Sequence, residues 1–241
     1  LDYVAEVLAD DPAGYWRFEE TAGAVATDSS GNNRNATVNG GVTLGVDGVL
    51  AGTGDHSARF NGSSGYVQLP GAWGGAGWSE LTIEAWVNTA DPITADFQSV
   101  LSGHDPNAFA HFQLFSAGNT GIYTDAGFVA TPIIPATPTG TWRHVVITAK
   151  SGESKVYVDG EQVGSTVTTA FNNIAPSSNV SIGLGHANSR WFRGQIDEVA
   201  IYDQALSEER VLLHFLAGDG GGEPEPEPDD AELLAHWTFD A

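Results

Sequence analysis

Apolar and polar positions alternate over many short stretches of this chain, and a period of two is typical of β-strands. In the segment 81–88, LTIEAWVN, every second residue is apolar. Two further short strands, 155–158 and 161–163, flank the dipeptide Asp159-Gly160. Asp-Gly supplies the positive φ angles of a type I′ turn, so this stretch predicts a β-hairpin.

Similar strand candidates recur at fairly even spacing, separated by turns rich in the 30 glycines of the chain. They cover residues 15–18, 57–61, 66–69, 98–102, 111–115, 121–124, 142–149, 180–184 and 196–202. Helix is predicted only in a short lead-in at 1–8 and after Ser207, a residue suited to capping a helix. Many short strands with little helix indicate an all-β sandwich.

The segment 196–202, IDEVAIY, is also expected to alternate. Strict alternation places Asp197 and Glu198 on opposite sides of the sheet. A short helix is expected to begin where this strand ends.

The composition narrows the function classes. The chain carries 9 Lys+Arg against 31 Asp+Glu, a formal net charge of −22. Such a surface repels nucleic acid and anionic membranes and favours cations, although high solubility is an equally open explanation. Cysteine is absent, which excludes disulfides and thiolate metal sites, and no apolar run approaches the length of a membrane span.

The composition changes after Gly218. Residues 219–230 form an acidic linker rich in Pro and Gly, and residues 231–241, AELLAHWTFDA, resemble the stretch around Trp16. We expect one domain over 1–218, the linker, and then the start of a second copy, with a tail that pairs back on the domain as the alternative. Because the sequence has no initiator Met or signal-like segment, we expect a piece of a longer protein.

Seven motifs occur in a characteristic order: AGYWRFEET, TDSSGNNRNATV, ARFNGSSGYVQLP, LTIEAWVNT, TWRHVVITAKSGESKVYVDGEQVG, VSIGLG and FRGQIDEVAIYDQALSEERV. This order resembles the laminin-G-like, concanavalin A-like jelly-roll domains of bacterial surface and secreted proteins, over about residues 3–218. The resemblance implies an all-β, two-sheet antiparallel jelly-roll β-sandwich with a short C-terminal helix. It also implies an extracellular or cell-surface location.

The resemblance implies a structural calcium ion near the chain ends. If the first and last strands pair, Glu20 and Asp197 converge, and the loop 27–35 brings Asp28 and Asn33 to the same edge. Hard oxygen ligands of this kind favour Ca²⁺. We predict Asp28 and Asp197 as main ligands, with Glu20 and Asn33 as further ones. Alternatively, Asp28 forms only an Asx turn and Asp197 is a solvated strand residue.

Catalysis is not expected. Glycosidases need two carboxylates facing the scissile bond. Related laminarinase-type enzymes carry Glu-x-Asp-x-x-Glu on one strand, but this sequence has Gln195 and Ala200 at the two Glu positions. The seven histidines are scattered singly along the sequence.

A noncatalytic jelly roll binds ligands on its concave face or rim, and aromatic rings beside polar groups suit sugars. The predicted ligand-binding residues are His104, Tyr123, His186, Asn188, Arg190 and Trp191. Trp16, Trp86 and Trp142 are expected in the core, whereas Trp73 and Trp78 could belong to core or rim.

These features favour a noncatalytic, calcium-stabilised carbohydrate-binding or adhesion module of a large exported bacterial protein. Its expected partner is a glycan or a surface protein, and the module itself is expected to be monomeric within a multidomain chain. The alternatives are a structural spacer or protein-interaction domain of a surface adhesin, and an accessory domain of a glycoside hydrolase.

Overall fold

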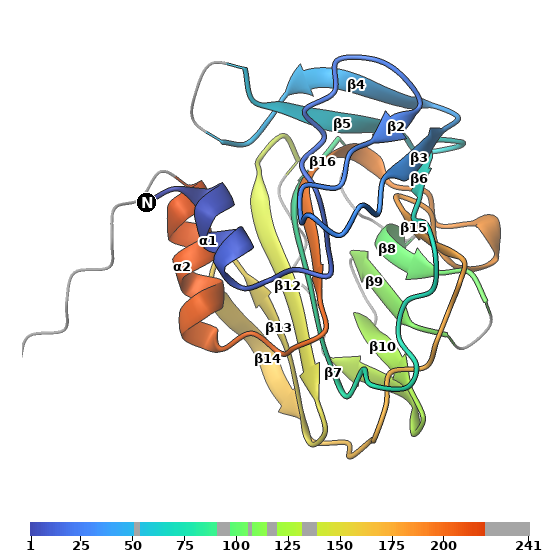
Figure 1. The fold of residues 1–241 in the computed structure, drawn as a ribbon, viewed down its shortest axis with the longest axis vertical. Helices are drawn as coiled ribbons and strands as arrows, with labels where there is room; N and C mark the ends of the chain where they lie inside the picture. Colours follow the sequence, from blue (N-terminus) through green and yellow to red (C-terminus); the bar gives the residue numbers. More distant parts are fainter. Residues whose placement is uncertain (51–53, 91–96, 106–107, 115–119, 132–138, 220–241) are drawn as a thin grey trace, which may run out of the picture.

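Two antiparallel sheets packed face to face form the protein in the computed structural model, as Figure 1 shows. The structure describes residues 1–50, 54–90, 97–105, 108–114, 120–131 and 139–219. The expected all-β sandwich with a short C-terminal helix is confirmed.

The first sheet, called sheet A here, has the strand order β14-β13-β12-β7-β16-β5-β4, with β1 added beside β16. The strands are β1 (Gly14–Trp16), β4 (Val42–Asp47), β5 (His56–Asn61), β7 (Glu80–Thr89), β12 (Arg143–Lys150), β13 (Glu153–Val158), β14 (Glu161–Val167) and β16 (Arg193–Tyr202). The predicted pairing of the first and last strands is confirmed, because Trp16 lies opposite Val199.

The second sheet, called sheet B here, has the order β11-β10-β9-β8-β15-β6-β3-β2. The strands are β2 (Val25–Ala26), β3 (Ala36–Asn39), β6 (Tyr66–Gln68), β8 (Gln98–Gly103), β9 (Ala110–Leu114), β10 (Thr120–Thr124), β11 (Gly127–Thr131) and β15 (Val180–Ile182). A 3₁₀ turn, η1 (His186–Asn188), lies in the connection from β15 to β16.

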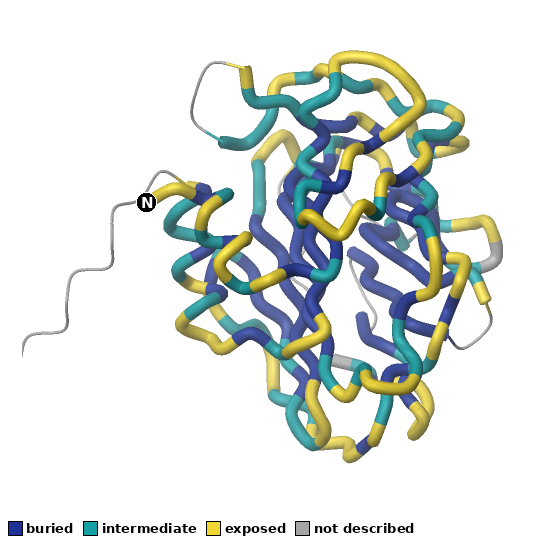
Figure 2. The backbone as a smooth tube through the Cα atoms, in the orientation of Figure 1, coloured by how far each residue is buried: buried dark blue, intermediate teal, exposed yellow. Residues whose placement is uncertain are grey.

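The main core fills the space between the sheets, where Figure 2 shows the buried parts of the strands. Alternate residues such as Ile83 on β7 and Phe112 on β9 point into it. Trp73 is also buried there, with its ring 5.7 Å from that of Trp16, and Trp78 packs partly buried against the same core. Trp73 and Trp78, which the sequence assigned to either core or rim, therefore both belong to the core.

Helices α1 (Tyr3–Ala9) and α2 (Glu208–Gly218) cover part of the outer face of sheet A, as seen at the left of Figure 1. They bury a second apolar cluster that includes Tyr3, Trp86 and Val211. Ser207 caps α2 as predicted, since its side chain accepts a hydrogen bond from the Arg210 N–H. Neither helix has the length and apolarity that a membrane crossing requires.

The hairpin between β13 and β14 forms as predicted, with φ of 52° at Asp159 and 78° at Gly160. The predicted end of the first domain coincides with the end of α2 at Gly218. Residues 220–241 lie outside the described part, so the linker and the second copy stay predictions.

The expected alternation in β16 is wrong because the strand contains a β-bulge. Its register against β7 shifts between Asp197 and Ala200, and Glu198 has a φ of 50°. Ile196, Val199 and Ile201 consequently point into the core between the sheets. Asp197 and Glu198 both lie on the outer side, because the bulge inserts one residue that is not in phase.

Candidate functional site

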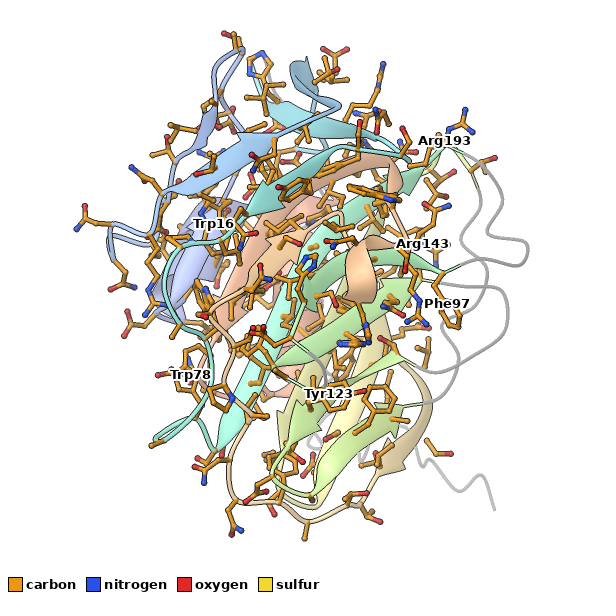
Figure 3. All side chains as sticks on the ribbon, turned by 90° about the vertical axis from the view of Figure 1, so that its right-hand side faces the viewer. Trp16, Trp78, Phe97, Tyr123, Arg143 and Arg193 are labelled. Atoms are coloured by element: carbon orange, nitrogen blue, oxygen red, sulfur yellow. The ribbon has the colours of Figure 1, made fainter. Side chains whose placement is uncertain are left out.

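A group of rings lies on the outer face of sheet B, the side that Figure 3 views. The ring of His111 on β9 lies 4.9 Å from that of Tyr123 on β10 and 5.2 Å from that of His186 in η1. Phe128 on β11 packs 5.0 Å from Tyr123. Their strand neighbours Ala110, Ile122 and Val129 point into the core, so alternation places the rings on the outer face. We call these four residues the ring cluster.

Two buried polar side chains at this cluster have unused hydrogen-bonding capacity. His111 and Gln113 are 6% and 2% exposed, yet His111 Nε2 and Gln113 Nε2 have no hydrogen-bond partner among the described residues. Most buried polar groups are paired, and an unpaired one costs about 1–3 kcal/mol. Both atoms are buried as well as unpaired, so a ligand that offers hydroxyl groups reaches them only when the side chains that cover them move.

Arg190 borders the cluster from the β15–β16 connection. Its Nη1 donates to Gln113 Oε1 at 2.9 Å, and its guanidinium lies 4.2 Å from the centre of the Phe97 ring. Its carbonyl also accepts from the Ser99 N–H at 2.9 Å, which ties this loop to β8. The Gln113 side chain is thus held by one end and leaves its amide nitrogen unused.

Two histidines at this face, His104 and His111, are neutral at pH 7. Burial, together with His186, lowers the pKa of His111 to about 4. Burial and His186 also lower the pKa of His104, whose Nε2 lies 2.5 Å from Ser181 Oγ. A neutral imidazole offers one donor and one acceptor, which suits a hydroxyl group.

The structure brings five of the six predicted ligand residues to this region. Tyr123 and His186 meet at His111, Arg190 reaches it through Gln113, and His104 lies near His186 and Asn188. Trp191 instead packs against Tyr66, with ring centres 6.2 Å apart.

His111, Gln113 and Phe128 were not predicted as site residues, although the alternation of 110–114, AHFQL, placed His111 and Gln113 on one side. Histidines that are isolated in the sequence approach one another in the folded structure. His104, His111 and His186 approach one another on sheet B, while His144 and His214 both contact Glu84 on sheet A.

A second polar group is a partly buried cluster of carboxylates, called the acid cluster here, in which Glu198 alone is fully buried. Oxygen atoms of Glu19, Asp55 and Glu198 all lie within 4.8 Å of one another. Arg17 contacts Glu198 at 3.1 Å and Glu19 at 2.6 Å, and the Tyr15 hydroxyl donates to Glu198. Asp55 Oδ1 is buried and has no hydrogen-bond partner in the part of the chain that the structure describes.

Asp197 lies beside the acid cluster. Its carboxylate is fully buried and accepts from the Val49 and Glu198 N–H groups at 3.0 and 2.9 Å. Burial, with the neighbouring charges of Glu198 and Asp55, raises the pKa of Asp197 well above its usual range. Burial likewise raises the pKa of Glu198 to about 8 and that of Asp55 to about 6.

The other predicted metal ligands are used differently. The Asp28 carboxylate accepts from the N–H groups of Tyr15, Ser30 and Arg34 at 3.0, 2.9 and 2.8 Å, which includes an Asx-type turn. Glu20 accepts from the Thr27 N–H at 2.7 Å. The exposed Asn33 side chain donates to the Gly31 carbonyl at 3.4 Å. Of the four predicted ligands, Asp197 is the one that interacts with members of the acid cluster.

The sequence did not single out Glu19, Asp55 or Glu198 as ligands. The bulge at Glu198 turns this side chain toward Tyr15 and Arg17. Asp55 arrives from the β4–β5 connection, and its Oδ2 accepts from the Leu50 N–H at 2.7 Å. Neither feature leaves a recognisable motif in the sequence.

The stacked antiparallel sheets define a concanavalin A-like β-sandwich. The chain belongs to the laminin-G-type branch of the concanavalin A-like lectin/glucanases superfamily, whose family model matches residues 60–212. The human adhesion G-protein coupled receptor D1 is 28% identical over 116 residues, which are 45% of this chain and 13% of the receptor. The chain thus spans a small part of that relative.

Solved structures with the same fold come from binding domains and larger enzymes. Domain 4 of AbnA, a GH43 extracellular arabinanase from Geobacillus stearothermophilus solved with arabinotriose, has a TM-score of 0.54 and 22% identity, covering 85% of this chain and 98% of that domain. Trypanosoma rangeli sialidase in complex with sialic acid has a TM-score of 0.62 and 16% identity, and the match covers 92% of this chain and 38% of the sialidase. The botulinum neurotoxin serotype D binding domain has a TM-score of 0.64 and 14% identity, and the match covers 86% of this chain and 51% of that structure. At these identities the likeness shows the fold.

Proposed function

We propose that this domain is a noncatalytic glycan-binding module that uses the outer face of sheet B. The observation that carries the proposal is the ring cluster beside the unpaired buried nitrogens of His111 and Gln113. A sugar ring has an apolar face that stacks on Tyr123 or Phe128, and its hydroxyl groups pair with such nitrogens once the side chains that cover them move aside. A neighbouring structure, domain 4 of AbnA, was solved with arabinotriose, which supports a carbohydrate ligand.

The burial of the carboxylates supports a noncatalytic role. A glycosidase needs two carboxyl groups in contact with its sugar. Asp197 and Glu198 are both 0% exposed and lie on the outer side of sheet A, away from the ring cluster. They cannot touch a sugar bound at sheet B.

Replacing Tyr123 by alanine is expected to weaken glycan binding about tenfold, because one stacking surface is lost. His111→Ala is expected to act similarly by removing an imidazole that hydrogen-bonds a hydroxyl group. The probe is an array of neutral and acidic oligosaccharides that includes arabinotriose, followed by calorimetric titration of the best binder.

Leu212→Ala is the matched control, since Leu212 is an exposed apolar residue on α2. It should leave the affinity unchanged. A loss in Trp191→Ala without a loss in Tyr123→Ala would move the site to the pair formed by Trp191 and Tyr66. If no glycan binds while surface proteins do, the protein-interaction alternative replaces this proposal.

We also propose a structural Ca²⁺ ion at the acid cluster, held by Glu19, Asp55 and Glu198 with Asp197 alongside. Four carboxyl groups meet a single arginine, Arg17, and the raised pKa values of Asp197 and Glu198 show that their negative charges are not fully compensated, so a cation that binds here would displace their protons. The buried oxygen Asp55 Oδ1, which has no hydrogen-bond partner among the described residues, fits a cation that takes six to eight oxygen ligands. An ion there would neutralise the cluster and join β16 to the β4–β5 connection.

The cellular location and the repeat arrangement of the module form a separate proposal. We propose an extracellular or cell-surface location, within an exported multidomain bacterial protein that carries tandem copies of a monomeric module. One structural neighbour is a domain of an extracellular arabinanase, which supports both this location and the accessory-domain alternative. Tandem copies would raise affinity through effective concentration. The sequence of the parent protein tests both points.

A further inference from the structure

A hollow lies on the outer face of sheet A, at the ends of β4, β5, β16 and β7. Its volume is about 650 Å³, within the range that sugar-sized ligands occupy. Five of its lining residues carry the chemistry discussed below: Thr43, Arg59, Asn88, Arg193 and Gln195. We call it the arginine hollow.

The strand register places these side chains on one face. Thr43 lies opposite Arg59, Arg59 opposite Gln195, and Gln195 opposite Asn88, in one row across four strands. Arg193 lies two residues before Gln195 on β16, so its side chain has the same direction. Phe60 and Ile196, the neighbours of Arg59 and Gln195, are buried in the core, which makes the row face outward.

The charge of this hollow is opposite to that of the protein. The chain has a net charge of −22, yet the described residues that line the hollow include two arginines and neither Asp nor Glu. The Arg59 side chain is exposed and makes no hydrogen bond, ion pair or ring contact with the part of the chain that the structure describes.

The remaining polar groups suit a hydroxylated ligand. The Gln195 amide nitrogen donates to the Asp47 carbonyl and to Ser57 Oγ, both at 2.9 Å, which fixes the side chain and leaves its oxygen as an acceptor. Asn88 makes no side-chain hydrogen bond with described residues, and Thr43 adds an exposed hydroxyl group. Hydroxyl and amide groups around two guanidinium groups match a sugar that carries an acid.

We propose that the arginine hollow binds the carboxylate of an acidic sugar, such as a uronic acid unit of a polysaccharide. Guanidinium groups recognise carboxylates through paired, charge-assisted hydrogen bonds. Arg59 and Arg193 bind the acid, while Asn88, Gln195 and Thr43 contact hydroxyl groups of the same unit. This site is separate from the ring cluster, which lies on the outer face of the other sheet.

Calorimetric titration with tri-galacturonic acid tests the proposal in the full chain, with neutral galactotriose as the comparison. We expect binding of the acidic trisaccharide that weakens as salt increases. Arg59→Gln should reduce its affinity at least tenfold. The matched control is Lys150→Gln, which removes the same charge at the opposite end of sheet A and should change the affinity less than twofold.

Each other outcome overturns the proposal. Equal losses in Arg59→Gln and Lys150→Gln would indicate general electrostatic attraction, and no binding of the acidic trisaccharide would exclude the class. Stronger binding of a sulfated trisaccharide or of a poly-glutamate peptide would assign the hollow to that ligand. Tyr123→Ala should leave uronate binding unchanged, so failure here is distinguishable from failure of the proposed ring-cluster function.

Discussion

Replacing Glu84 by glutamine is expected to lower the free energy of unfolding by about 3–5 kcal/mol, the usual cost of removing one partner from a buried ionic group. Glu84 is 0% exposed beneath the two helices. It accepts from the Tyr3 and Tyr202 hydroxyls at 2.8 and 2.9 Å. His144 Nε2 and His214 Nδ1 lie 2.8 and 3.1 Å from Glu84 Oε1.

The pH dependence of this effect follows from the two pKa shifts. Burial alone would raise the pKa of Glu84, but the His214 charge and hydrogen bonds hold it well below its usual 4.5. Its contribution is therefore present above about pH 4.5 and is lost as the pH falls. Glu84 and Asp10 raise the pKa of His214 from 6.5 to about 9 despite burial. That contribution is complete below pH 6.5 and is lost as the pH rises through about 9.

Urea unfolding of both proteins between pH 3 and pH 10 checks this prediction. The difference in stability should be largest between about pH 4.5 and 6.5 and should shrink on either side. Glu153→Gln is the control, because Glu153 forms exposed ion pairs with Lys150 and Lys155, which are worth at most about 1 kcal/mol. A loss of unfolding free energy below 1 kcal/mol in Glu84→Gln would contradict the prediction, because it would show that the charge of Glu84 does not stabilise the fold through His144 and His214.

Calcium at a hundred times its dissociation constant is expected to raise the midpoint of thermal unfolding by about 5–10 °C. An ion that binds the native state alone adds about 2.7 kcal/mol at that concentration, and each kcal/mol shifts a domain of this size by about 2–4 °C. Asp55→Asn should abolish the shift, because it removes a carboxylate that belongs to the acid cluster and has an unpaired oxygen. Thermal melts with calcium and with a chelator measure both effects.

Asp28→Asn is the discriminating control for the calcium site. The Asp28 carboxylate is occupied by three backbone N–H groups, so its replacement should lower the melting midpoint in the absence of calcium. The calcium-induced shift should nevertheless persist. If the shift disappears in Asp28→Asn and survives in Asp55→Asn, the ligand set predicted from the sequence is correct and the acid cluster binds no calcium.

Much of the fold could be predicted because it depends on local patterns. The alternation of 81–88 places β7 correctly, and the turn chemistry of Asp159-Gly160 places the β13–β14 hairpin. Strands β3 and β4 were not predicted. The sequence of β3 is mostly polar, and although β4 alternates, with Val42, Leu44 and Val46 at every second position, the glycines in and around it favour a loop. The place of β3 in sheet B depends on its pairing with β6, which follows β4 and β5 in the sequence. Strand β4 pairs with its sequence neighbour β5.

The sites were harder to predict because they depend on geometry between distant segments. A single bulge at Glu198 reverses the direction of one side chain and creates the acid cluster from residues that looked like an ordinary strand. Likewise, Arg59 and Arg193 are 134 positions apart in the sequence and share a hollow only because β5 pairs with β16. Residue types were visible in the sequence, but their neighbours were not.

The two helices on sheet A have a mechanical consequence. Arg210 on α2 contacts Glu6 and Asp10 at 2.9 Å each, and His214 contacts Asp10 at 3.0 Å, so the first and last helices are joined directly. Tension that pulls α1 away from α2 acts on these contacts first, one after another, before it reaches the hydrogen bonds between β1 and β16. The domain should therefore yield by peeling at low force and recover when the tension is released, while the paired sheets stay intact.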